Sequence, residues 1–168
     1  MVPSPTNGHY ELTPEMSADK ITEKVLENLT NYHFIAVNFA NADMVGHTGN
    51  FEATVKAIEK MDECAGKIVS RALESDGVII ITSDHGNAEE KIYRFSGENK
   101  TKHSLNPVPF FLVGQNFKSP EPLSKEAISQ KYKEVAGTLS DVAPTVLELL
   151  GLQTPPEMTG KSLIGKIF

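Results

Sequence analysis

The stretch VIIITSDHGNAEE, residues 78–90, sets an apolar run directly against a pair of ionisable residues. An unbroken apolar run of this kind is typical of a strand that is buried on both faces of a sheet. Asp84 and His85 follow the run at once, and Gly86 permits the chain to turn there. We therefore expect a strand over 78–83, with an acid and a metal-seeking base at the rim of the core.

Two further apolar runs predict strands before and after this one. FIAVNFA (Phe34–Ala40) is expected to be a buried strand, and PVPFFLVG (107–114) a strand whose prolines favour an edge or a strand start. Residues 51–75 predict a long amphipathic helix. Its expected inner stripe consists of Val55, Ile58, Ala65, Ile68, Val69 and Ala72. Strand, helix and strand in this order predict a right-handed crossover in a parallel sheet.

Other segments complete an α/β pattern. Helices are expected over 17–29, after an N-cap at Ser17, and over 139–151, while 86–106 is expected to be a long polar loop. The predicted fold is a partial, mostly parallel sheet with helices on both faces. Its strands are too few for the wide sheets that such helices normally cover, so we expect the chain to form part of a larger sheet.

Composition excludes several classes of protein. The 168 residues carry a net charge of −6, which argues against binding to nucleic acid or to an anionic membrane. No apolar run approaches the roughly 20 residues of a membrane-spanning helix. The single cysteine, Cys64, is expected to be a small buried apolar side chain. Together with the lack of a signal peptide, it predicts a reducing, cytoplasmic location.

Candidate metal ligands occur in three places. Asp43 and His47 lie four residues apart in NADMVGH and would share a face if that stretch is helical. Asp84 and His85 follow the strand 78–83, and His103 precedes the next strand. Each motif alone is typical of an ordinary helix face, turn or loop. Their succession at strand ends, where open α/β sheets bind ligands, favours a metal site.

The composition of this ligand set indicates the chemistry. Imidazole with carboxylate suits Mn²⁺ and Zn²⁺, and suits Mg²⁺ or Ca²⁺ less well. Five ligands are too many for one tetrahedral ion with an open position, and they fit two neighbouring ions, an arrangement that stabilises phosphoryl displacement.

The loop charges Glu89, Glu90, Lys100 and Lys102 are expected to be solvated.

A series of phrases along nearly the whole chain resembles one enzyme family. The phrases are VPSP…PEMSA, NFANADMVGHTGN, DECAGKIV, TSDHGNAE, NPVPFFLVG, LSDVAPTVLELLG and EMTGKSL, in this order. They resemble the carboxyl-terminal part of cofactor-independent (2,3-bisphosphoglycerate-independent) phosphoglycerate mutase, in the alkaline phosphatase superfamily. SDVAPTVLELLG recurs across that superfamily, whereas NFANADMVGHTG with DHGNAE is similar to the mutase in particular.

The resemblance implies that residues 1–168 are the carboxyl-terminal portion of a metal-binding, phosphatase-like domain. Such enzymes interconvert 3- and 2-phosphoglycerate in glycolysis and gluconeogenesis through a phosphoserine. By motif, Asp43, His47 and His103 would hold one metal ion, and Asp84 and His85 the second. The family usually binds Mn²⁺, with Zn²⁺ and Mg²⁺ as alternatives. The implied partners are a small phosphoglycerate and an amino-terminal segment acting in trans.

The chain departs from the family pattern in two respects. The segment that supplies the nucleophilic serine and a further aspartate is not among these residues, nor is the arginine-rich transferase domain, so no catalytic residue is assigned. Thr6 stands where the family has a phosphate-binding lysine. We expect one ion to bind well, a second weakly, and no mutase turnover by the chain alone. Two alternatives stay open: a related phosphohydrolase or phosphopentomutase, and a noncatalytic metal-binding remnant.

Overall fold

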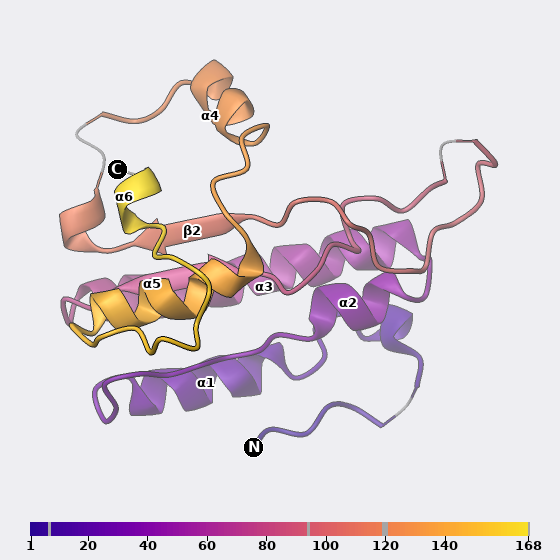
Figure 1. The fold of residues 1–168 in the computed structure, drawn as a ribbon. Coiled ribbons are helices and arrows are strands. Elements are labelled where there is room, and N and C mark those ends of the chain that lie inside the picture. The colour runs from indigo at the N-terminus through magenta and orange to yellow at the C-terminus, as the bar shows by residue number, and fades with distance from the viewer. Residues whose placement is uncertain (7, 94, 119–120, 168) are drawn as a thin grey trace. The chain divides into compact units, whose positions relative to one another are not determined.

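The computed structural model describes residues 1–6, 8–93, 95–118 and 121–167, which divide into two compact units, Met1–Asn116 and Phe117–Phe168. The elements are traced along the chain in Figure 1. The helices are α1 (Ala18–Asn28), α2 (Asn41–Gly46), α3 (Phe51–Leu73), α4 (Lys125–Lys131), α5 (Val142–Leu149) and α6 (Ile164–Ile167). The strands are β1 (Ile79–Thr82) and β2 (Phe110–Val113), and short 3-10 turns occur at η1 (Tyr10–Leu12), η2 (Gln115–Phe117) and η3 (Leu139–Asp141).

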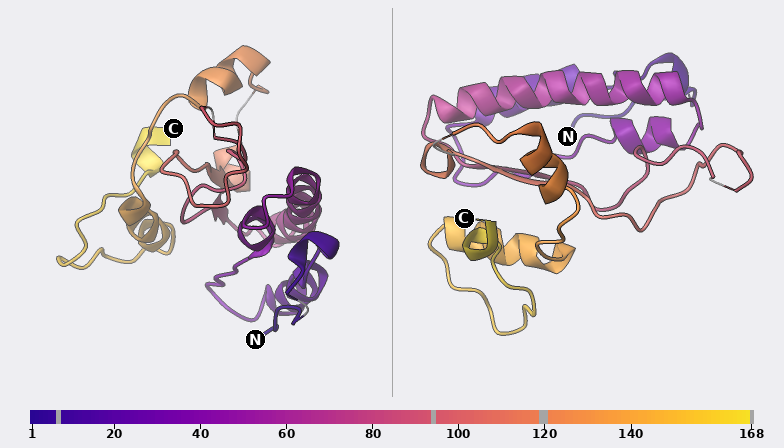
Figure 2. Two further views of the ribbon diagram at one scale, coloured as in Figure 1. Left: turned by 90° about the vertical axis from the view of Figure 1, so that its right-hand side faces the viewer. Right: turned by 90° about the horizontal axis from the view of Figure 1, so that it is seen from above.

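The long helix α3 organises the first unit, and α1 and α2 both pack against it (Figures 1 and 2). It begins at an effective cap, because the side chain of Asn50 accepts a hydrogen bond from the amide of Ala53 at 3.0 Å. It ends as the sequence predicts: Asp76 adopts a left-handed conformation with φ of 54°, and the amide of Gly77 returns to the carbonyl of Ala72 at 2.8 Å.

The buried face of α3 differs from the predicted stripe. Ala72 is buried as expected, but Val55 and Ile58 are 39% and 42% exposed. The buried positions are instead occupied by small residues: Ala53, Thr54, Ala57, Cys64 and Ala72. Small side chains let neighbouring helices approach closely, so the contact face is chosen by size as well as by polarity. Cys64 is fully buried, which confirms its predicted packing role.

The two strands form an antiparallel pair, in which Ile79 lies opposite Val113 and Thr82 opposite Phe110. The strands predicted over 78–83 and 107–114 are therefore confirmed, but the mostly parallel sheet is not found among the described residues. The reason is the connection between them. The described residues of 86–106 (86–93 and 95–106) contain no crossover helix, and a connection of this kind returns the chain in the opposite direction.

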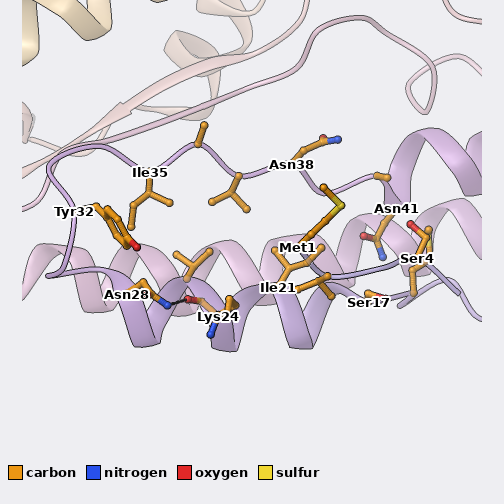
Figure 3. A pocket seen from close by; sticks show the side chains of 16 residues that line it. Met1, Ser4, Ser17, Ile21, Lys24, Asn28, Tyr32, Ile35, Asn38 and Asn41 are labelled. Atoms are coloured by element: carbon orange, nitrogen blue, oxygen red, sulfur yellow. Dashed lines mark hydrogen bonds between the residues drawn. The ribbon is translucent and has the colours of Figure 1, made fainter.

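The predicted strand Phe34–Ala40 is not formed. This segment has neither helix nor strand structure, and Phe34 is 57% exposed. A strand needs a neighbouring strand for its backbone groups, and residues 34–39 make no backbone hydrogen bond to the rest of the described chain. The segment instead runs beside α1, and a pocket lined by Ile35, Tyr32 and Ile21 lies between the two (Figure 3).

The second unit is stabilised by hydrogen bonds around the start of α5. Asp141 accepts hydrogen bonds from the amide of Thr138 at 2.9 Å and from the amide of Lys161 at 2.8 Å. The fully buried hydroxyl of Thr145 accepts from the amide of Leu163 at 2.9 Å. These bonds tie the tail, expected to be loop-like, to α5. Across both units, no helix of the described residues is long and apolar enough to cross a membrane.

Candidate metal centre

Helix α2 presents the first two candidate ligands on one face. Asp43 lies in its first turn and His47 caps its end, so the two side chains are one turn apart. The Nε2 atom of His47 lies 3.2 Å from Oδ1 of Asp43. This confirms the helical geometry on which the predicted pairing depends.

A backbone bridge brings the other two histidines together. Gly86 pairs with Ser104 in an isolated antiparallel bridge, and the amide of Ser104 donates to the carbonyl of Gly86 at 2.8 Å. Their chain neighbours, His85 and His103, consequently lie side by side with stacked rings 3.6 Å apart at 16°. The pairing of residues 86 and 104 therefore places the candidate ligands His85 and His103, one on each side of the loop, next to each other.

Three ligand atoms from these elements form a nearly equilateral triangle. Oδ1 of Asp43 lies 3.2 Å from Nε2 of His47 and 3.1 Å from Nε2 of His103. The two imidazole nitrogens are 3.1 Å apart. Ligand atoms about 2.1 Å from one ion lie about 3.0 Å apart at right angles and about 3.4 Å apart in a tetrahedron. The triangle therefore has the size that a first-row divalent ion requires.

The orientation of the His47 ring strengthens this fit. Its Nδ1 atom lies 2.6 Å from the carbonyl oxygen of Thr101. A carbonyl can only accept, so Nδ1 donates this hydrogen bond and Nε2 is the ring nitrogen that faces Asp43 and His103. A backbone partner on the far nitrogen is also the usual outer support of a metal-bound histidine.

The predicted second pair is more loosely arranged. His85 Nε2 lies 3.9 Å from Asp43 Oδ1 and 3.6 Å from Asp84 Oδ1. Asp43, His85 and His103 also form a group whose candidate ligand atoms lie within 4.8 Å of one another. The side chain of Asp84 is 87% exposed and reaches the cluster only through His85. The buried Nδ1 atom of His85 has no hydrogen-bond partner in the described chain.

The sequence did not indicate the hydrogen bonds that surround these candidate ligands. Glu89 is exposed, as expected, and its carboxylate also accepts hydrogen bonds from the amide of Asn87 at 2.7 Å, from Asn106 at 2.9 Å, and from the hydroxyl of Ser104. Burial opposes its ionisation, but these hydrogen bonds prevail and hold the pKa of Glu89 below its usual value. Because Ser104 belongs to the backbone bridge, Glu89 stabilises the bridge that holds His85 beside His103.

Two further residues of the loop are buried beside the ligands. Asn87 donates to Asp43 Oδ1 at 2.8 Å, and the ammonium of Lys91 donates to Asn87 Oδ1 at 2.7 Å. Burial lowers the pKa of Lys91. Lys100 and Glu90 also differ from expectation, because they pair at 2.6 Å, whereas Lys102 is exposed as expected. None of these residues has a periodic signal, and only their position after DHG in the sequence marks them.

The family to which the chain is related follows from comparison with known proteins. Residues 1–154 match the family model described as the metalloenzyme superfamily. The chain belongs to the metalloenzyme superfamily. This membership agrees with a cluster of one carboxylate and three imidazoles whose atoms converge on a common point.

Curated phosphoglycerate mutases resemble the chain closely. It is 47% identical over 168 residues to the 2,3-bisphosphoglycerate-independent phosphoglycerate mutase of Clostridioides difficile, covering 99% of this chain and 31% of that protein. The enzyme of the same name from Clostridium botulinum is 49% identical over 166 residues, covering 98% of this chain and 30% of that protein. The chain thus spans about 30% of the length of the curated relatives it matches.

A solved structure of a superfamily member shares the fold. Leishmania mexicana phosphoglycerate mutase, crystallised at low cobalt concentration, matches with a TM-score of 0.78 and 30% sequence identity. The match covers 95% of this chain and 30% of the Leishmania chain. The resemblance to phosphoglycerate mutases that the sequence phrases indicate is therefore confirmed.

Proposed function

We propose that this chain is a metal-binding portion of a cofactor-independent phosphoglycerate mutase. Asp43, His47 and His103 would hold one divalent ion, and Asp84 and His85 would contribute to a second site completed by residues outside these 168. The reaction would be the interconversion of 3- and 2-phosphoglycerate. The names of the curated relatives support the reaction, and the converging ligand atoms support the metal.

The observation that carries the proposal is the triangle of Asp43, His47 and His103. A carboxylate oxygen and two imidazole nitrogens lie mutually 3.1–3.2 Å apart, and the ring of His47 is oriented by a backbone carbonyl. Divalent ions in such sites neutralise charge on a phosphoryl group in transfer. We propose Mn²⁺ as the resident ion, because nitrogen and oxygen ligands together suit it.

The unpaired segment 34–40 supports the second part of the proposal, that turnover requires further chain. Its backbone makes no sheet hydrogen bonds to the described residues, and Phe34 and Val37 are exposed. The remaining length of the relatives would supply a strand for this segment, the reactive serine and the residues that orient glycerate. The supplying segment acts within the same enzyme or in trans. The cytoplasmic location stays a prediction.

A Mn²⁺ titration of the purified chain tests the metal site. We expect one ion to bind tightly to the wild type, Asp43→Ala to abolish binding, and His85→Ala to change it little. The reason is that Asp43 Oδ1 lies 3.2 Å and 3.1 Å from the Nε2 atoms of His47 and His103, whereas Nε2 of His85 lies 3.9 Å from it. A tight ion that survives Asp43→Ala would contradict the assignment, and its loss in His85→Ala alone would move the site to the other triad.

A coupled assay of 2-phosphoglycerate formation tests the reaction. The purified chain is expected to show no turnover, and activity should appear when the complementary portion of the Clostridioides difficile enzyme is added. Turnover by the chain alone would contradict the need for further residues. Ion binding without any rescued turnover would favour the noncatalytic remnant.

A related phosphohydrolase or phosphopentomutase is the second candidate. The family model that matches residues 1–154 describes a superfamily rather than one reaction, so the metal centre alone does not select the substrate. The completed enzyme should be assayed with phosphoglycerates, phosphopentoses and a simple phosphomonoester. Faster reaction with either of the latter two would replace the mutase proposal while leaving the metal site intact.

A further inference from the structure

A chain of hydrogen bonds from a buried ammonium ends on the shared ligand Asp43. Lys91 is only 6% exposed, and its Nζ donates to the carbonyl of Gly46 and to Oδ1 of Asn87, each at 2.7 Å. Asn87, itself 5% exposed, donates from Nδ2 to Oδ1 of Asp43 at 2.8 Å and to the carbonyl of Asp43 at 3.3 Å. The loop after β1 is thereby fastened to α2.

Lys91 determines which way the amide of Asn87 faces. An ammonium has donors only, so the atom of Asn87 that meets it must be the carbonyl oxygen. The NH₂ group must then face Asp43, as the short contact with the carboxylate requires. The reverse orientation would set two donors against each other at Lys91 and two acceptors against each other at Asp43. Both costs fall on buried groups, where unpaired polar atoms are destabilising.

The hydrogen bonds of Lys91 and Asn87 fix the two halves of the candidate metal centre relative to each other. Asp43 and His47 belong to α2, whereas His85 and His103 belong to the ends of the loop that contains Asn87 and Lys91. Gly46 allows this close approach, because a Cβ there would lie 2.8 Å from Oδ1 of Asn87. The contacts of Lys91 with Gly46 and of Asn87 with Asp43 are side-chain bonds that join these halves.

From this geometry we propose that Asn87 is a positioning residue for the metal ligand Asp43 and that Lys91 holds Asn87 in its working orientation. This inference rests on the proposed metal-binding function. Asn87 holds one carboxylate oxygen at the point where the imidazole nitrogens of His47 and His103 converge. Outer partners of metal ligands act in this way, and their loss weakens metal affinity by roughly 10- to 100-fold.

Isothermal titration of the whole chain with Mn²⁺ tests the inference, with thermal unfolding of the metal-free protein as the second measurement. Asn87→Ala should weaken Mn²⁺ binding roughly 10- to 100-fold. Lys91→Met keeps the length of the side chain, removes its donors and frees the amide of Asn87 to rotate, so a smaller loss is expected. Each variant leaves a buried polar group without its partner, so some loss of unfolding temperature is expected, and Mn²⁺ affinity is compared at a temperature where the metal-free variants are folded.

Lys60→Met is the matched control. Lys60 is also largely covered, with a side chain 19% exposed, and it pairs with Asp19 at 2.7 Å and Glu63 at 3.0 Å, away from the ligands. Its replacement should leave Mn²⁺ affinity unchanged. A purely structural role of Asn87 and Lys91 would lower the unfolding temperature without changing the affinity of the folded protein.

The outcomes separate the inference from the proposed function. Wild-type affinity retained in a folded Asn87→Ala or Lys91→Met chain overturns the corresponding positioning role while the metal site stands. No Mn²⁺ binding by the wild type overturns both. If both variants lose their helical circular dichroism at 20 °C in the experiment, the inference is also rejected, because a contact that the fold cannot lose is structural.

Discussion

Gly86 has no side chain, and this allows the candidate ligands His85 and His103 to lie side by side. A Cβ at Gly86 would overlap Oγ of Ser104 and lie 2.5 Å from Oε1 of Glu89. We expect Gly86→Ala to open the bridge, separate His85 from His103, and destabilise the fold by about 1–3 kcal/mol, as overpacking does. Urea unfolding and Mn²⁺ titration measure the two effects.

Gly66→Ala provides the matched comparison for that substitution. Gly66 lies inside α3, and nothing stands within 4 Å of a Cβ added there. Alanine in a helix interior is favoured over glycine by about 0.5–1 kcal/mol, so this variant should be more stable and bind Mn²⁺ normally. Equal behaviour of the two variants would show that the close approach at Gly86 is unimportant.

One carboxylate of the second unit makes that unit sensitive to acid. Hydrogen bonds from the amides of Lys161 and then Thr138 hold the pKa of Asp141 below its usual value. A group with a lowered folded-state pKa contributes stability that is complete above its unfolded-state pKa, about 3.9, and is lost as the pH falls through the folded-state pKa. Asp141→Asn should therefore destabilise at neutral pH, and its difference from the wild type should shrink towards acid.

Hydrogen exchange of the amides of Lys161 and Thr138 between pH 7 and pH 3 in the experiment checks this expectation. Glu148→Gln, which removes an exposed carboxylate from α5, is the control and should not change the profile of these amides. A constant difference between Asp141→Asn and the wild type over the whole range would assign the effect to shape rather than charge.

At the scale of elements, α3 depends on one cap for its start. The side chain of Asn50 accepts from the amide of Ala53, an otherwise unpaired donor of the first turn. Asn50→Ala should cost about 1 kcal/mol of unfolding free energy, whereas Asn50→Asp retains an acceptor and should cost little. Urea unfolding monitored by helical circular dichroism gives both values, and equal losses would show that the cap is not the cause.

Elements with a local signal could be predicted from the sequence, and those that depend on distant partners could not. α1 and α3 follow from helical spacing, and β1 and β2 from short apolar runs. The mostly parallel sheet is not found among the described residues, because strand direction depends on the connection and 34–40 forms no strand there. The face of α3 was wrong at Val55 and Ile58 because the choice between adjacent apolar stripes depends on which neighbours cover them.

The residues of the candidate site also divide into those with a local sequence signal and those that depend on distant partners. Asp43 and His47 have helical spacing, and His85 and His103 lie next to apolar runs, so their approach was predictable, and the structure brings them together. Asn87, Glu89 and Lys91 lie in an aperiodic polar loop. Asn87 and Lys91 are buried in contact with Asp43 and Gly46 of α2, positions more than 40 residues away that no local pattern connects.

At the scale of the whole molecule, the first unit has a small core and an extended segment, 34–39, with no strand partner in the part of the chain that the structure describes. Val45, Ala53 and Ala57 form its buried cluster, while Phe34 and Val37 in the unpaired segment are exposed. An extended run of free backbone donors and acceptors is a template for strand addition. The proposed complementary portion of the enzyme would occupy this position.

Hydrogen exchange of the whole chain gives the test at this scale. In the chain alone, the amides of 34–39 should exchange rapidly because they have no backbone acceptor among the described residues, whereas those of β1, Ile79–Thr82, should be slower. Addition of the complementary portion of the Clostridioides difficile enzyme should slow exchange at 34–39 and leave α4, Lys125–Lys131, unchanged as an internal control. Slow exchange before addition would show that the segment already has a strand partner in solution. Rapid exchange after addition, in a mixture that has gained mutase activity, would show that the enzyme is completed at another surface.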